Sequence, residues 1–367
     1  MDLLTIVSQL NQDNILELFK NIFNIYILYT SSKFIKQNKE KNKFKIHKMP
    51  KSFRYSDVLL PPEIVDKELK LEKKDIMSKC FKDELLLFCN TLSNKFKPDD
   101  LRLFYNNLKQ LKIKKYIFHN HIVNCYNAMS NTIKIDKKEK NVIYHELFHM
   151  ASSIGTKNRV FIGFRQFDLK ECKEIGNGLN EGYTEYMTLK YFFNVDYLFK
   201  SGYWVETIIS SQLEKIIGND KMESLYMQAN LLGLINELEK YNTKDKIIEF
   251  LKDLDLYSGR GKLGDLSKSQ NKYIIEKHLK NINKFLCTTY FRKISSQLVK
   301  KQISDDDFSK LVQDFSSSLI YDVTESKFKY DVTYKDVFSI DMLNEIVKEI
   351  FDNNIKIDTK ELTNKKR

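Results

Sequence analysis

The residues with the clearest chemistry in this chain form the pentapeptide His145-Glu146-Leu147-Phe148-His149. On an α-helix, residues four apart lie on one face, so both imidazoles can point at the same metal ion. Glu146 follows the first histidine and can reach a water molecule bound to that ion. Because the chain has only 6 histidines among 367 residues, this spacing arises by chance on the order of once per hundred such sequences. The pattern therefore predicts a metal site with a general base beside it.

A second motif, with two carboxylates in helical spacing, follows in Asn180-Glu181-Gly182 and Glu185. Two histidines leave a catalytic zinc site incomplete, because such sites usually take three protein ligands and keep a fourth position for water. Glu181 is expected to be the third ligand. Glu185 falls on the same helical face, where it can hydrogen-bond the free ring nitrogen of a ligand histidine. The sequence thus predicts one Zn²⁺ per chain, held by His145, His149 and Glu181. The simplest alternative is a helix whose two histidines only cap or pack.

Together, the two motifs resemble those of the gluzincins, the thermolysin-like branch of the zinc metallopeptidases. The resemblance covers roughly residues 98–255, and the strings 144–152 and 178–186 also resemble an uncharacterised group of low-GC bacterial proteins. It implies a hydrolase that cleaves a peptide or protein substrate. By position, His145, His149 and Glu181 match the family's zinc ligands, Glu146 its general base and Glu185 its supporting carboxylate.

The sequence departs from the family in two ways. The gap between His149 and Glu181 is longer than in thermolysin-like or aminopeptidase gluzincins, and the G-x-M-E-N exopeptidase motif is absent. Endopeptidase and exopeptidase activity, the natural substrate and the oligomeric state therefore stay open. So does the residue that stabilises the oxyanion, for which the available candidates are His119, His121, Tyr183, Tyr186 and His278.

Two other classes of function remain. One is a zinc-binding protein without turnover, although a purely structural site has no need of the carboxylate of Glu146. The other is a basic helical adaptor for nucleic acid or a membrane surface, suggested by the net charge of +12. However, 54 of the 61 basic residues are lysine and 7 are arginine. Arginine is better suited than lysine to bidentate hydrogen bonds with phosphates and bases. We expect no specific nucleic-acid partner.

Cysteine usage and the N-terminal region bear on localisation. The five cysteines are scattered, with no C-x-x-C pair, which disfavours a disulfide framework and fits a reducing compartment. No secretion signal is evident. The apolar stretch 15–29 is interrupted by Glu17 and Lys20 and is short for a transmembrane segment. It suits a buried or partner-packed helix, with membrane-surface contact as the alternative. We expect a cytoplasmic protein.

The pattern along the chain predicts an α+β fold that is predominantly helical. A zincin-like lobe, with a small β-sheet and the metal-binding helix, would precede a helical C-terminal lobe. The expected domains are an N-terminal helix and basic linker over 1–62, the catalytic lobe over 63–195 and the helical domain over 196–367.

Within these domains, helices and short strands are expected from periodicity and caps. The helices cover 1–35, 99–111, 139–153, 179–192, 207–217, 221–240, 243–254, 271–286, 304–319 and 340–351, and the strands cover 115–119, 121–126 and 131–135. Residues 154–177 form a long connection, in which 160–164 is a strand or a flap over the cleft. The family resemblance implies that 131–135 is an edge strand that pairs with an extended substrate.

Overall fold

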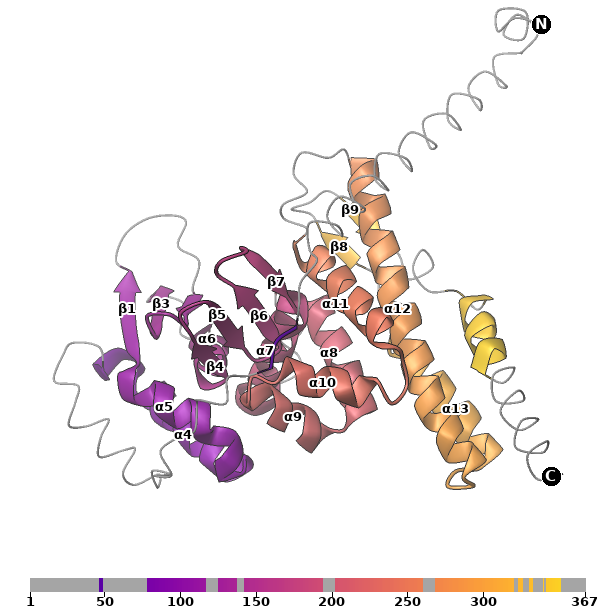
Figure 1. The fold of residues 1–367 in the computed structure, drawn as a ribbon, viewed down its shortest axis with the longest axis horizontal. Coiled ribbons are helices and arrows are strands. Elements are labelled where there is room, and N and C mark those ends of the chain that lie inside the picture. Colours follow the sequence, from indigo (N-terminus) through magenta and orange to yellow (C-terminus); the bar gives the residue numbers. More distant parts are fainter. Residues whose placement is uncertain are drawn as a thin grey trace, which may run out of the picture.

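The fold is known from a computed structural model, which describes residues 46–48, 78–116, 125–136, 142–193, 202–259, 268–319, 323–325, 330–332, 339 and 341–350. These residues form an α+β structure that is mostly helical, with small sheets (Figure 1). This agrees with the predicted class. The helix predicted over 1–35, most of the linker after it and the greater part of the strand predicted over 121–126 lie outside the described residues.

The elements are as follows. The labelled helices are α4 (Ser78–Lys95), the 3-10 helix η1 (Pro98–Leu101), α5 (Arg102–Gln110), α6 (Ile143–Ala151), α7 (Asn177–Phe192), α8 (Trp204–Ile217), α9 (Asn219–Met227), α10 (Leu231–Leu238), α11 (Lys244–Ser258), α12 (Lys268–Val299) and α13 (Asp305–Ser317). Residues 341–350 are also helical. The strands are β1 (Lys112–Tyr116), β2 (Cys125–Asn127), β3 (Thr132–Asp136), β4 (Ser153–Gly155), β5 (Arg159–Ile162), β6 (Arg165–Asp168), β7 (Lys173–Ile175), β8 (Val323–Glu325) and β9 (Tyr330–Val332).

The first sheet has the strand order β1-β3-β2. Strand β3 pairs in parallel with β1, with Ile113 opposite Ile133, and antiparallel with β2, with Tyr126 opposite Ile133. The expectation that the strand before the metal helix is an edge strand is therefore wrong, because β3 has neighbours on both sides. Among the described strands, β2 is the edge strand that packs against α6.

The long connection predicted between the two motif helices contains a second sheet. Strands β4 to β7 form an antiparallel meander, of which the sequence predicted only the part around 160–164. Each strand has three or four residues, too few for an alternating pattern to stand out. The β5–β6 turn passes through Gly163 with φ +49, a conformation that favours glycine.

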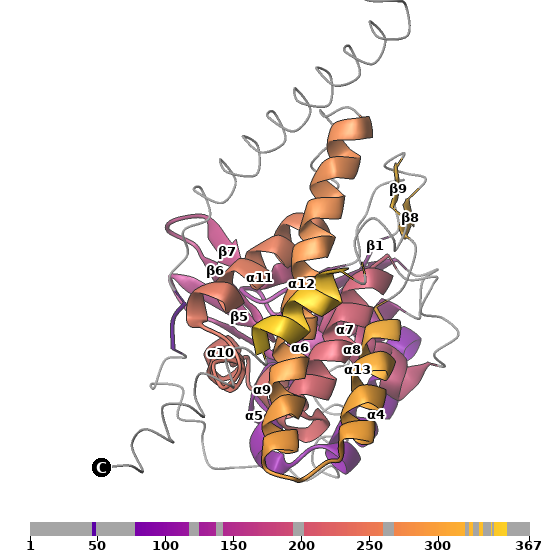
Figure 2. The same cartoon turned by 90° about the vertical axis from the view of Figure 1, so that its right-hand side faces the viewer.

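The helix predicted over 221–240 is in fact two helices, α9 and α10. They are separated by a turn in which Ala229 adopts φ +51, and the side chain of Asn230 then accepts a hydrogen bond from the backbone N–H of Gly233 at 2.8 Å. An asparagine cap of this kind starts a new helix. In contrast, α12 runs well beyond the predicted 271–286 and is the long helix that packs along α11 (Figure 2).

One hydrophobic cluster extends through most of the described chain, from Phe81 to Ile350. Beneath α6 it contains an aromatic group in which Phe88 contacts Phe104, Phe148 and Phe192 at ring-centroid distances of 5.8, 5.0 and 5.5 Å. Helices α7 and α8, on either side of the boundary predicted at 195, pack closely together. In the described part of the chain, no helix combines the length and apolar character that crossing a bilayer requires.

Candidate metal centre

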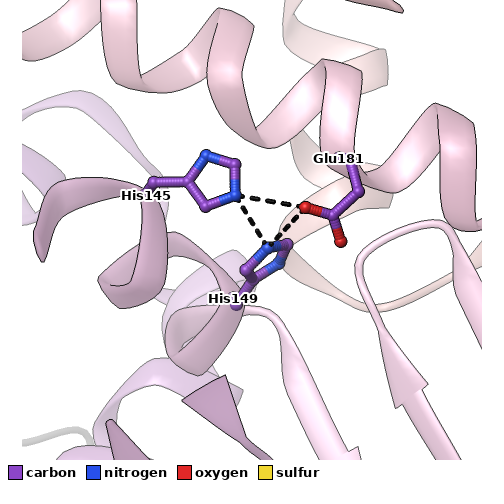
Figure 3. A group of neighbouring side chains, drawn as sticks. All are labelled: His145, His149 and Glu181. Carbon is purple, nitrogen blue, oxygen red and sulfur yellow. Dashed lines mark hydrogen bonds and ion pairs between the residues drawn. The ribbon is translucent and has the colours of Figure 1, made fainter. Parts of the chain in front are cut away.

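Three side chains from two helices converge at one point (Figure 3). The Nε2 atoms of His145 and His149, both on α6, lie 3.0 Å apart. The Oε2 atom of Glu181, on α7, lies 3.3 Å from Nε2 of His145 and 3.4 Å from Nε2 of His149. This is the group that the two sequence motifs predict.

The arrangement fits a metal ion. With ligand bonds of 2.0–2.2 Å, the ligand atoms of a tetrahedral zinc lie about 3.3 Å apart, and the three separations of 3.0, 3.3 and 3.4 Å match this spacing. Two imidazoles and one carboxylate are also a donor set that zinc accepts in catalytic sites, with a fourth position left for water. The His-His-Glu group can therefore hold a metal ion.

Helix α6 is rigidly placed because all nine of its residues are buried. Leu147 and Phe148 are fully buried in the hydrophobic core. The end of the helix is held from α5, where Nδ2 of Asn107 donates to the backbone oxygens of Met150 and Ser153 at 2.8 and 2.7 Å. The contact with Met150 satisfies a backbone oxygen at the C-terminal end of α6, and the contact with Ser153 holds the start of β4.

Helix α7 is anchored at its N-terminus from α11. Both carboxylate oxygens of Asp255 accept hydrogen bonds, from the backbone N–H groups of Gly176 and Gly178, each at 2.8 Å. A carboxylate at this end of a helix satisfies free N–H groups and interacts favourably with the helix dipole. Gly182, next to the ligand Glu181, lets α8 approach, since a Cβ atom there would overlap the backbone oxygen of Glu206. The glycine of the second motif thus serves helix packing.

A second layer of polar groups holds the imidazoles. Nδ1 of His145 lies 2.8 Å from Oε2 of Glu185. Since a carboxylate accepts, this contact puts the ring proton on Nδ1 and leaves Nε2 free for a metal. Nδ1 of His149 lies 3.3 Å from Nδ2 of Asn180 and 3.4 Å from Oγ1 of Thr184. All three contacts join a histidine on α6 to a side chain on α7.

The ionisable groups of the site are strongly perturbed. Burial lowers the pKa of His145, but its hydrogen bonds with Glu181 and Glu185 outweigh this and raise the pKa to about 10. Burial raises the pKa of Glu181, yet the charges of His149 and His145 hold it well below 4.5. Burial raises the pKa of Glu146 against the lowering influence of both histidines. Without metal, the site therefore contains a buried ion pair between His145 and Glu181.

Two further elements border the site. Glu146 is buried, at 4% exposure, and its carboxylate accepts a hydrogen bond from the backbone of Tyr126 on the edge strand β2. Tyr203, directly before α8, lies on His145 with ring centroids 5.9 Å apart and an interplanar angle of 13°. The carboxylate of Glu181, together with burial, raises the pKa of this phenol.

The described residues among those proposed from sequence for oxyanion stabilisation lie elsewhere. Tyr183 and Tyr186 both donate to Glu214 on α8, at 2.6 and 3.0 Å. His278 on α12 is buried and contacts Asp253 on α11 at 3.0 Å. The remaining two candidates, His119 and His121, lie outside the described residues. None of the three described candidates joins the His-His-Glu group.

Sequence reasoning overlooked four residues that build the site: Thr184, Tyr203, Tyr226 and Asp255. Thr184 had a usable signal, since it lies four residues after Asn180 on the ligand helix. Tyr226 donates its hydroxyl to Thr184 at 2.5 Å, because the hydroxyl of Thr184 itself donates to the backbone oxygen of Asn180. Tyr226 and Asp255 come from other helices and Tyr203 from the turn before α8, and no local pattern points to them.

Comparison with known proteins adds no assignment: no protein-family model, no curated protein and no solved structure matches this chain.

Proposed function

We propose that this protein is a zinc-dependent metallopeptidase of the gluzincin type. The observation that carries the proposal is a buried carboxylate, Glu146, placed directly beside a His-His-Glu group with the spacing of zinc ligands. The sheet β1-β3-β2 and helix α6 would form the zincin-like lobe. The sequence resemblance supports this reading, since the residues that converge are those that match the family's motifs.

In the proposed reaction, a zinc ion bound at this site would lower the pKa of a water molecule to around 7 and polarise the scissile carbonyl. As general base, Glu146 would take a proton from the attacking water, and it would pass this proton to the departing amine when the C–N bond breaks. The raised pKa of Glu146 suits this exchange, because a base works best when its pKa lies near the operating pH.

The other polar residues around the site hold the two histidine rings in place. Glu185 orients the ring of His145 and fixes its protonation, while Asn180 and Thr184 hold the ring of His149. Among the described strands, β2 is an edge strand, and the backbone of its residue Tyr126 contacts Glu146. An extended peptide would enter along this side of α6. The substrate class proposed is therefore a peptide or protein segment in extended conformation.

The test compares the wild type with Glu146→Gln and with the control Glu171→Gln. The control changes a glutamate with 61% side-chain exposure that pairs only with Lys173 among the interactions described. Each protein is assayed for bound zinc and for cleavage of a broad peptide library. We expect about one zinc per chain in all three. Cleavage should fall on the order of 10²–10⁴-fold in Glu146→Gln alone.

Two results would contradict the proposal. If the wild type purified from metal-replete cells contained no zinc, the proposed metal site would be contradicted. Zinc in all three proteins with no cleavage of any peptide by the wild type would favour the alternative, a zinc-binding protein without turnover.

A further inference from the structure

One row of paired residues crosses all four strands of the β4–β7 meander. Ile154 on β4 is paired with Phe161 on β5, which is paired with Gln166 on β6. Gln166 is in turn paired with Ile175 on β7. Directly paired residues lie on the same face of a sheet, and the four side chains are buried, at 5%, 1%, 2% and 1% exposure in this order. A glutamine therefore occupies a position whose neighbours in the row are all apolar.

The amide of Gln166 is hydrogen-bonded to a part of the chain that is distant in sequence. Its Oε1 accepts from the backbone N–H of His47 at 3.0 Å, and its Nε2 donates to the backbone oxygen of His47 at 3.1 Å. A buried amide costs free energy unless its donor and its acceptor are both hydrogen-bonded. Residues 46–48, the strap (indigo in Figure 1), therefore supply the partners that make a polar side chain acceptable in this row.

Gln166 contacts the main chain of the strap. A side-chain amide carries an acceptor and donors in one plane, so it can bond the N–H and the C=O of a single residue, as a neighbouring strand does in a hydrogen-bonded pair. Ile46, which precedes His47, is partly buried and packs against the large hydrophobic cluster, whereas Lys48 is exposed. The strap is thus held by its backbone and by one apolar side chain.

Strand β6 begins at a turn that contacts the surroundings of the candidate metal centre. In this turn the backbone N–H of Phe164 donates to Oδ1 of Asn180 at 3.3 Å, and Nδ2 of Asn180 lies 3.3 Å from Nδ1 of His149. Gly163 is so close that a Cβ atom there would lie 2.4 Å from Oδ1 of Asn180. Gln166 is the second residue of β6. Contacts that hold the strand at Gln166 therefore also hold the turn beside Asn180.

We propose that Gln166 is a docking site for a segment of main chain, that the strap is its occupant, and that this docking anchors the N-terminal region to the sheet that supports the metal centre. Because the strap belongs to the same chain, it binds at the high effective concentration of an intramolecular partner. Two hydrogen bonds and one apolar side chain are therefore enough to hold it. The docking itself depends on neither zinc nor peptide cleavage, and only its effect on the metal centre rests on the proposed zinc site.

The test measures how often the strap leaves the sheet. Trypsin must bind the main chain before the peptide bond that follows Lys48, which Gln166 holds, so the rate of cutting at this bond follows the population of the released strap. In Gln166→Leu, which keeps the row apolar, the rate should rise about 10–100-fold, as expected from the loss of two hydrogen bonds between uncharged groups. The matched control is Gln110→Leu, at an exposed glutamine that ends α5, and it should be cut at the wild-type rate.

A second variant, His47→Pro, releases the strap without changing a residue of the sheet. Proline has no N–H, so the hydrogen bond to Oε1 of Gln166 is lost. Cutting after Lys48 should again be faster than in the wild type, and zinc affinity should fall several-fold in both His47→Pro and Gln166→Leu.

Three results would count against the proposal. Cutting at the wild-type rate in both variants would overturn the docking. Faster cutting with unchanged zinc affinity would overturn the effect on the metal centre. If the wild type bound no zinc, the metal site and this effect would be overturned together, and the cutting rates would still decide the docking.

Discussion

Nδ1 of His145 on α6 lies 2.8 Å from Oε2 of Glu185 on α7, with both side chains largely shielded from solvent. The same α7 helix supplies Glu181 to the Nε2 side of that imidazole. One helix therefore provides both a candidate metal ligand and the group that orients another ligand. The four-residue spacing of the two glutamates makes this arrangement possible.

Replacement of Glu185 by alanine is predicted to weaken zinc binding without removing a ligand. Loss of the supporting carboxylate frees the ring of His145 to rotate and lowers its basicity, which typically costs 10–100-fold in metal affinity. Competition with a chelator of known affinity measures the change. Glu171→Ala, at the exposed turn before β7, is the matched control and should leave the affinity unaltered. Equal affinities in the two variants would show that the contact does not support the metal.

Gly182→Ala is predicted to destabilise the protein and disturb the site. The added methyl group would overlap the backbone of Glu206, so α8 must shift away from α7. Overpacking of this kind costs about 1–3 kcal/mol in the free energy of unfolding. The measurements are thermal unfolding and zinc affinity, since the shift moves Glu181.

The control for this change is Gly259→Ala. Gly259 has φ −78 and an added Cβ would meet nothing within 4 Å. Because alanine restricts the unfolded chain, this variant should be as stable as the wild type or slightly more stable, by up to about 1 kcal/mol. If Gly182→Ala unfolded at the same temperature as the wild type, the close packing of α7 and α8 would be contradicted.

The metal-free protein is predicted to lose stability as pH rises. The folded pKa of His145, about 10, lies above its ordinary value of 6.5, so the folded state holds this proton more tightly than the unfolded chain. The contribution of His145 is fully present below about pH 6.5 and is lost as pH rises through about 10. Urea denaturation of the metal-free protein across this range measures it. A flat profile in that window would contradict the ion pair with Glu181.

Zinc binding should release a proton over the same range, because the metal needs the Nε2 lone pair of His145. Calorimetric titration in two buffers of different ionisation enthalpy counts the protons at pH 7.5. We expect about one proton per zinc from His145. Glu181→Gln removes a negative charge that raises the pKa of His145, so the number of protons released per zinc should fall. An unchanged count would contradict the coupling between these two residues.

Cysteine reactivity offers a test of the fold away from the site. Cys172 is exposed, whereas Cys287 is fully buried and burial raises the pKa of its thiol to about 12. Since the thiolate is the reactive form, a short pulse of iodoacetamide at pH 8 should label Cys172 and leave Cys287 unmodified. Peptide mass mapping reads both positions. The same pulse in guanidinium chloride should label both, and rapid labelling of Cys287 in the native protein would contradict its burial.

The sequence predicted the helical parts of the site well because their information is local. The spacing of His145 and His149 and that of Glu181 and Glu185 follow from the turn of an α-helix alone. The helices expected over 139–153 and 179–192 correspond to α6 and α7 within a few residues at the described ends. The four-stranded meander was largely overlooked, and one predicted helix became α9 and α10, because short strands and a single asparagine cap carry weak signals.

What the sequence determined by itself is therefore a set of residue types held at helical spacing: two imidazoles, a base and two carboxylates. Only the tertiary structure decided which imidazole contacts Glu185, that β3 lies inside its sheet, and that Asp255 and Tyr203 border the two motif helices. The contacts of Glu185, Tyr203 and Asp255 join residues from 40 to 79 positions apart in the chain. They depend on how helices and strands pack around a common core, which no local spacing encodes.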